Sequence, residues 1–125
     1  MATRQSKKKT DKPTIGIKIL SSMLADRHSG DPTLMEPKPF INIDNAREEM
    51  NRDVINYLNG FEAVDPKSGA IDYDTIDSID GGQDYENVKD LSEYITSEAD
   101  SIEINVDSDG TWAKWDITES SLELG

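Results

Sequence analysis

The sequence lacks the residues on which many active sites and metal centres are built. It contains no cysteine, which excludes disulfide bonds, thiolate zinc sites and thiol nucleophiles. His28 is the single histidine, and no serine in a nucleophile motif accompanies it. A glycine-rich phosphate loop is absent too, since the acidic residues after Gly81-Gly82 would repel a phosphate. We therefore expect a protein that is not an enzyme and needs no cofactor.

Long hydrophobic runs are also missing. The apolar stretch from Ile15 to Leu20 is interrupted by Gly16 and Lys18 and is too short for the core of a signal peptide. No segment reaches the roughly 20 apolar residues that a membrane-spanning helix needs. We expect a cytoplasmic protein without a membrane partner, placed in the host cytoplasm if the source is viral.

Basic residues are scarce beyond the first twelve positions. Residues 1–12 carry five basic residues against one acidic residue, whereas residues 61–125 carry eighteen acidic residues against three lysines. The whole chain has a formal net charge of −13 and a pI near 4.3. Nucleic acid and anionic membranes are polyanions that repel such a body, so we expect no direct nucleic-acid binding by the acidic part. A basic protein partner, a cation or simple solubility fits this charge better.

The charge segregation also predicts how the chain is organised. Residues 1–13 are polar and lack apolar periodicity, which is typical of a disordered arm. The remaining length suits one acidic domain, residues 14–120, followed by a flexible tail at 121–125. The arm is either a free tail or a tether onto nucleic acid or an acidic neighbour. Its basic residues are Arg4, Lys7, Lys8, Lys9 and Lys12.

The first half of the domain predicts a strand, a loop and a helix. Ile15, Ile17 and Ile19 alternate with Gly16 and Lys18, as in a half-buried strand. Prolines between residues 29 and 39 indicate a loop that ends in a short strand at residues 40–43. With Asp44 as N-cap, apolar residues then recur at helical spacing up to Phe61, and Asn59-Gly60 is the expected stop of the helix. This apolar stripe consists of Ala46, Met50, Val54, Tyr57, Leu58 and Phe61.

The second half predicts another helix and a C-terminal hairpin. Asp84 is the expected cap of the helix, whose apolar face consists of Tyr85, Val88, Leu91, Tyr94, Ile95 and Ala99. Residues 102–106 and 113–117 alternate on either side of a turn, which predicts a β-hairpin. Trp112 and Trp115 fall on opposite faces of it, so one should lie in the core and the other should cover a loop or anchor a partner. The expected fold class is α+β: two amphipathic helices packed on a small, mostly antiparallel sheet with a C-terminal hairpin.

The hairpin turn allows a second interpretation. Residues 105–116 place oxygen ligands at loop positions 1, 3, 5 and 12 and a glycine at position 6, so this segment resembles an EF-hand calcium loop. It departs from that pattern in the asparagine at position 1, the short aspartate at position 12 and flanks that alternate like strands. An ordinary tight turn is the alternative. The candidate ligands are Asn105, Asp107, Asp109, Thr111 and Asp116.

Acidic residues of the second half are the main candidates for partner binding. Carboxylates two apart on a strand lie roughly 6.6 Å apart, and those three or four apart on a helix about 5–6 Å, so a dense charged face can form. Such a face costs folding energy through self-repulsion. The candidate residues are Asp72, Asp74, Asp77, Asp80, Glu86, Asp90, Glu93 and Glu103.

Together these patterns predict an acidic interaction protein of phage or viral type. Its carboxylates would occupy a basic groove of a nucleic-acid-handling host factor and inhibit it, as DNA mimics do; the resemblance to such mimics is one of composition only. A structural or assembly component of a virion or another complex, docked through the basic arm, is a second hypothesis. A calcium-binding module is a third. The oligomeric state is left open.

Overall fold

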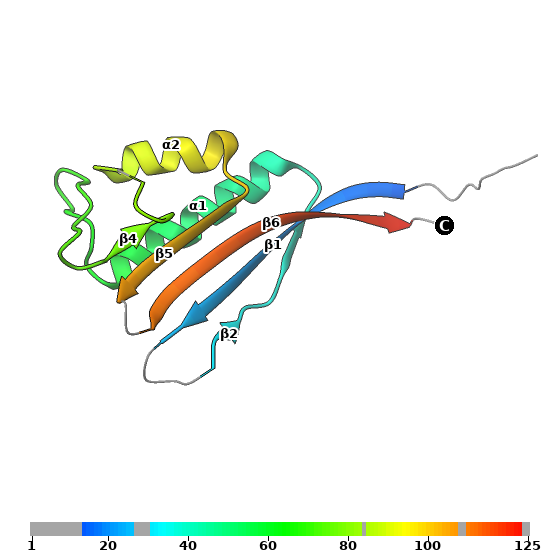
Figure 1. Cartoon of the computed structure of the whole chain (residues 1–125). Coiled ribbons are helices and arrows are strands. Elements are labelled where there is room, and N and C mark those ends of the chain that lie inside the picture. Colours follow the sequence, from blue (N-terminus) through cyan, green and yellow to red (C-terminus); the bar gives the residue numbers. More distant parts are fainter. Residues whose placement is uncertain (1–13, 27–30, 84, 108–109, 124–125) are drawn as a thin grey trace, which may run out of the picture.

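The computed structural model describes residues 14–26, 31–83, 85–107 and 110–123, so the predicted cap Asp84 and the candidate ligand Asp109 lie outside it. Two helices cover one face of an antiparallel sheet of six strands, which confirms the predicted α+β class and the C-terminal hairpin (Figure 1). The elements in chain order are β1 (Thr14–Ala25), β2 (Thr33–Leu34), β3 (Lys38–Phe40), α1 (Ile43–Gly60), β4 (Ser78–Ile79), α2 (Val88–Glu98), β5 (Ser101–Asp107) and β6 (Thr111–Glu123).

The sheet is organised around the pairing of β1 with β6. Its strand order is β2-β1-β6-β5-β4, and β3 pairs with the same strand, β1, as β2 does. β1 and β6 pair over twelve residue pairs, and β6 continues to Glu123, past Ile117, where the sequence alternation ends. Both strands are therefore longer than the sequence pattern indicated.

The far ends of β1 and β6 pair only with each other among the described residues. β3 reaches no further than Lys18 on β1, and β5 begins opposite Asp116 on β6. Residues 14–17 and 120–123 thus form a two-stranded ribbon, which we call the β1–β6 arm. It projects from the body on the right of Figure 1.

α1 carries the predicted apolar stripe, with a different cap. Asn42 is the N-cap, and its side chain accepts the backbone N–H of Asp44 at 2.7 Å. Asp44 itself lies in the first turn, where a negative charge is favourable beside the helix N-terminus. The buried residues of the helix are Ala46, Met50, Val54 and Leu58, whereas Phe61 is the exposed C-cap.

The N-cap of α2 lies three residues after the expected one. Asn87 is the N-cap and its side-chain oxygen accepts the backbone N–H of Asp90 at 3.0 Å. Leu91 and Ile95 are buried, as the helical spacing predicts. The helix lies beside α1 over the same face of the sheet (Figure 1).

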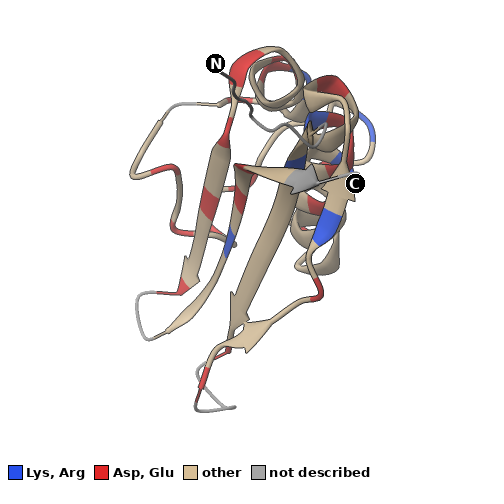
Figure 2. Ribbon diagram, turned by 90° about the vertical axis from the view of Figure 1, so that its right-hand side faces the viewer, with Lys and Arg blue, Asp and Glu red and all other residues tan. Residues whose placement is uncertain are grey.

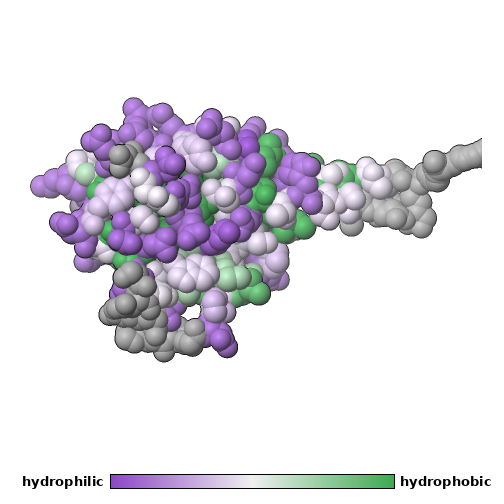
Figure 3. All heavy atoms as spheres, in the orientation of Figure 1, coloured by the Kyte–Doolittle hydropathy of each residue, from purple (hydrophilic) through white to green (hydrophobic). Residues whose placement is uncertain are grey.

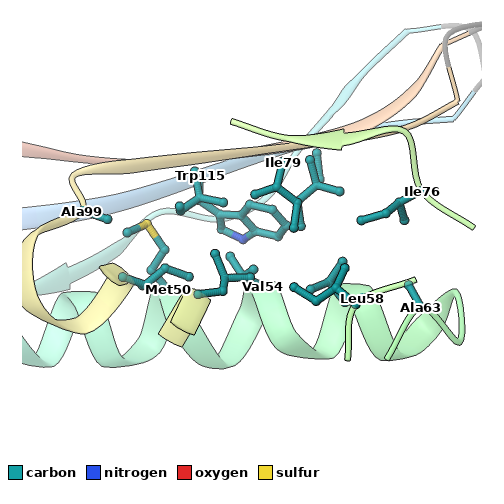
Figure 4. Packing of buried hydrophobic residues seen from close by; sticks show 14 of the residues in the cluster. Met50, Val54, Leu58, Ala63, Ile76, Ile79, Ala99 and Trp115 are labelled. Atoms are coloured by element: carbon teal, nitrogen blue, oxygen red, sulfur yellow. The ribbon is translucent and has the colours of Figure 1, made fainter. Parts of the chain in front are cut away.

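Trp115 lies in the core between the sheet and α1 (Figure 4). Its ring meets Tyr57 edge to face, with the ring centroids 5.5 Å apart. The stretch between the helices adds Ile71, Ile76 and Ile79 to this core, although their spacing fits neither a helix nor a strand. The stretch consists of turns, two isolated bridges and the two-residue β4, so these side chains reach the core without a regular period.

β1 presents its isoleucine row to the face opposite the helices. Leu20 is buried and Leu24 packs against the core, so the even-numbered positions of this strand face the helices. Side chains alternate between the two faces of a strand. Ile15, Ile17 and Ile19 therefore lie on the other face, and none of them belongs to the core cluster.

Candidate functional site

Seven of the eight predicted carboxylates belong to one stretch of the chain. This stretch, residues 72–93, comprises the connection between the helices, β4 and the first half of α2. In Figure 1 it lies at the end of the molecule away from the β1–β6 arm. We call these seven residues the acidic end: Asp72, Asp74, Asp77, Asp80, Glu86, Asp90 and Glu93.

Asp72 shapes the first turn of the acidic end. Its carboxylate accepts the hydroxyl of Thr75 at 2.8 Å and the backbone N–H of Asp74 at 2.9 Å. Both bonds favour the ionised form, so the Thr75 hydroxyl first and the Asp74 amide second hold the pKa of Asp72 below its usual value. Asp72 therefore stays negatively charged to a lower pH than an ordinary aspartate does.

Asp80 has a structural task in addition to its charge. Its backbone N–H donates to the carbonyl of Glu103 at 2.8 Å, and its carboxylate accepts the N–H of the same residue at 2.9 Å. These two bonds continue the pairing of β5 beyond the end of β4. Burial, aided by the nearby Glu103 charge and opposed by the backbone bond, raises the pKa of Asp80. Asp80 thus ties β4 to β5.

Four carboxylates of the acidic end are free to meet a partner. Asp74, Asp77, Glu86 and Glu93 are exposed, and among the described residues only their backbone atoms make hydrogen bonds. Asp90 is exposed as well, in the first turn of α2, where the helix dipole favours its charge.

The acidic end carries charge that its surroundings do not neutralise. Residues 62–98 hold eleven acidic residues and two lysines, a formal net charge of −9. Four basic side chains elsewhere pair with other acids: Lys18 pairs with Glu119 at 2.5 Å, and Arg47 with Asp100 at 3.1 Å. Lys38 and Arg52 likewise pair with acids of α1.

Among the ion pairs of residues 14–26, 31–83, 85–107 and 110–123, none includes a carboxylate of the acidic end. Figure 2 shows acidic ribbon segments on strands and helices alike, so what distinguishes this end is that many carboxylates without an ion pair belong to one stretch of the chain.

Glu103 lies apart from the other candidates, on β5. It alternates with the buried Ile102 and Ile104, and its strand neighbour across the sheet is Lys114. Glu103 borders a hollow of about 600 Å³ at the edge of the sheet. The hollow is also lined by Asp80, Tyr85, Tyr94 and Lys114, and the two tyrosine rings lie 5.9 Å apart. Burial, reinforced by Asp80, raises the pKa of Tyr85 to about 12, so this ring is neutral at physiological pH.

The hairpin does not bring the candidate calcium ligands together. Asn105 pairs with Trp112 and Asp107 with Thr111, whereas Asp116 pairs with Ser101. Asp116 therefore lies about 13 Å along β5 from Asn105, too far for both to bind one ion. In the part of the chain that the structure describes, no three acidic or histidine side chains are grouped closely enough to hold a metal.

A second surface was not singled out from the sequence. We call the side of the sheet away from the helices the open face. On β1 it carries Ile15, Ile17, Ile19, Met23 and Ala25, and on β6 Trp112, which pairs with Ala25. Leu34 of β2, 70% exposed, pairs with Met23 and extends this apolar surface. The signal in the sequence was that β1 has apolar residues at both odd and even positions, so that one set had to remain outside the core.

Comparison of the chain with protein-family models, with curated proteins and with solved structures gives no match. Within the described ranges, no helix has the length and apolar character that crossing a membrane requires.

Proposed function

We propose that this protein is a non-enzymatic acidic interaction protein whose acidic end occupies a basic groove of a nucleic-acid-handling protein and blocks it. The observation that carries the proposal is the set of exposed carboxylates without paired bases, while basic side chains elsewhere in the body pair with other acids. A chain under no demand for a charged surface gains stability by spreading its lysines among its acids. The uncompensated charge therefore supports a role in recognition.

The hollow beside the acidic end supports the same role. Its carboxylates, Asp80 and Glu103, and its rings, Tyr85 and Tyr94, offer ion pairing and cation–π contact to one inserted arginine or lysine side chain. Lys114 on the rim of the hollow repels further cations, so the hollow can take only a small number of them. Exposed carboxylates would then steer a basic partner toward this anchor. In this proposal the target is a DNA- or RNA-binding factor, and the protein is an inhibitor of phage or viral type.

The test compares two variants with the same change in charge. Asp74→Asn, Asp77→Asn, Glu86→Gln and Glu93→Gln together neutralise the acidic end. Asp31→Asn, Glu36→Gln, Asp44→Asn and Glu48→Gln neutralise exposed acids elsewhere, and both sets raise the formal net charge from −13 to −9. Each protein is used to capture partners from a host lysate at low and high salt, and binding to an arginine-rich peptide is measured as a defined probe.

We expect the acidic-end variant to bind at least about fourfold more weakly than the matched control, since four exposed pairs contribute about 0.2–1 kcal/mol each. Binding of the wild type should weaken as salt rises. Duplex DNA should compete with the protein for a captured partner. Equal losses in both variants, or a partner that holds DNA and this protein together, would rule out the mimic.

An assembly role is the second candidate, and one observation favours it. β1 begins at Thr14 on the β1–β6 arm, so the basic residues 1–12 join the domain at the end away from the acidic end (Figure 1). Residues 1–12 of one molecule could then reach an acidic neighbour. Removal of residues 1–12 would abolish copurification with a particle if this role is correct, and would leave capture by the acidic end intact.

A further inference from the structure

The geometry points to a second copy of this chain as the occupant of the open face. The apolar row of β1 runs along this face from Ile15 to Ala25, and helices cover only the opposite face. In Figure 3, hydrophobic and pale residues follow the path of β1 from the lower part of the body toward the arm, while hydrophilic residues gather over the upper left. The row is interrupted by Ser21, but no other element of the described chain covers its apolar residues. An uncovered group of apolar side chains on one face is typical of an interaction site.

The arm makes covering this face more favourable. Residues 14–17 and 120–123 form a two-stranded ribbon, and a ribbon of two strands is marginally stable in water by itself. Ile15 and Ile17 line one side of it, on the same face as Ile19 of the body. The isoleucines are half-buried in a single copy. Packing of a second sheet against that side would complete their burial and hold the ribbon in place.

The distribution of charge favours a second copy over a basic partner. The strand residues on the open face include one base, Lys114, and two acids, Glu103 and Asp116. This face is therefore close to neutral, although the chain carries −13. Two copies repel each other least where the local charge is small, whereas a basic partner is drawn to the acidic end.

The size and shape of the face also fit a symmetric pair. β1 with its twelve residues is about 40 Å long, and the three to four strands beside one another are about 14–19 Å wide. Such a face covers on the order of 600 Å² per copy. The total area buried by two copies would be twice this, at the lower end of the areas buried in specific interfaces. A two-fold axis would pack the two open faces about 10 Å apart, with Ile17 and Ile19 of both copies in the interface.

The test is the mass of the protein in solution. Sedimentation equilibrium of the full chain over a wide range of concentration should give twice the chain mass of 13.9 kDa at the upper end. The double variant Ile17→Thr/Ile19→Thr keeps β-branched residues on the strand and should weaken self-association by at least about tenfold. Ile41→Thr is the matched control, because Ile41 is 69% exposed and lies outside the sheet. Circular dichroism and thermal unfolding check that each variant is folded.

Salt separates this inference from the proposed function. Higher salt should tighten the pairing of two acidic copies, while it should weaken binding to a basic partner. Three results would each overturn the inference that a second copy covers the open face. The wild type could stay monomeric, the double variant could pair as well as the control, or the dimer could dissociate as salt rises. The last result would indicate that residues 1–12 of one copy bind the acidic end of another. The first two results do not bear on capture of a basic partner by the acidic end.

Discussion

At the scale of single residues, the carboxylates of the acidic end have different tasks. Asp72 forms a turn, Asp80 connects β4 to β5, and the side chains of Asp74 and Asp77 make no hydrogen bond or ion pair among the described residues. The sequence shows all of them as equivalent acids in an irregular stretch. Only the folded chain separates those that shape the surface from those that are available to a partner.

The raised pKa of Asp80 leads to a prediction about pH. Ionisation of a carboxyl destabilises the fold when its pKa is higher in the folded than in the unfolded state. The pKa of Asp80 is raised in this way, so the fold becomes more stable as the pH falls toward that pKa. Asp80→Asn keeps an acceptor for the Glu103 N–H without the charge. We expect this variant to be more stable than the wild type at pH 7, by less than about 1 kcal/mol because the site is partly solvated, and to lose the advantage toward pH 4. Urea unfolding over this pH range measures it.

Asp77→Asn is the control for that measurement, because it removes the same formal charge from an exposed side chain of the same stretch. The stability difference between this variant and the wild type should depend less on pH between 7 and 4. A wild type that is more stable than Asp80→Asn at pH 7 would show that ionised Asp80 stabilises the strand connection.

At the scale of elements, periodicity predicted α1, α2 and the β5–β6 hairpin, while caps and strand ends needed the structure. Asn42 and Asn87 cap the helices, although acidic residues beside them carry the same capping chemistry. The loop between residues 29 and 39 contains β2 and part of β3, because β1 is long enough to offer them an edge. Short strands of two or three residues leave no periodic signal.

The hairpin register leads to a prediction about calcium. A calcium loop formed by residues 105–116 would stabilise the fold on binding, by roughly 2.7 kcal/mol at a hundredfold excess over its dissociation constant. Because Asp116 pairs with Ser101 rather than lying near Asn105, we expect neither calcium nor a chelator to change the thermal midpoint. Differential scanning fluorimetry with magnesium as the control measures this. A rise with calcium that Asp107→Ala abolishes would support the metal loop.

At the scale of the whole molecule, the chain has two ends of different character. The acidic end carries exposed charge, and the β1–β6 arm carries Ile15 and Ile17 on a thin ribbon. The open face between them is close to neutral. This arrangement allows one molecule to pair with its own copy through the sheet and to meet a basic partner through the acidic end.

Self-repulsion at the acidic end leads to a prediction about salt and stability. Salt screens charges over a Debye length of about 10 Å at 0.1 M, so the thermal midpoint should rise as sodium chloride is added. The acidic-end variant should start from a higher midpoint at low salt, since relief of about 1 kcal/mol is worth about 2–8 °C in domains near this size, and should respond less to salt. The matched control variant should respond like the wild type. A midpoint that is independent of salt would show that the carboxylates do not repel one another appreciably.

The order of residues alone determined the segregation of charge, the apolar stripes of α1 and α2, and the hairpin, because each depends on spacing within a short segment. Tertiary structure decided which row of β1 enters the core. Both rows contain large apolar residues, Leu20 and Leu24 in one and Ile17 and Ile19 in the other, so alternation alone is ambiguous. Pairing with β6 and packing of α1 placed the leucines inside, and that choice left the isoleucines on the open face.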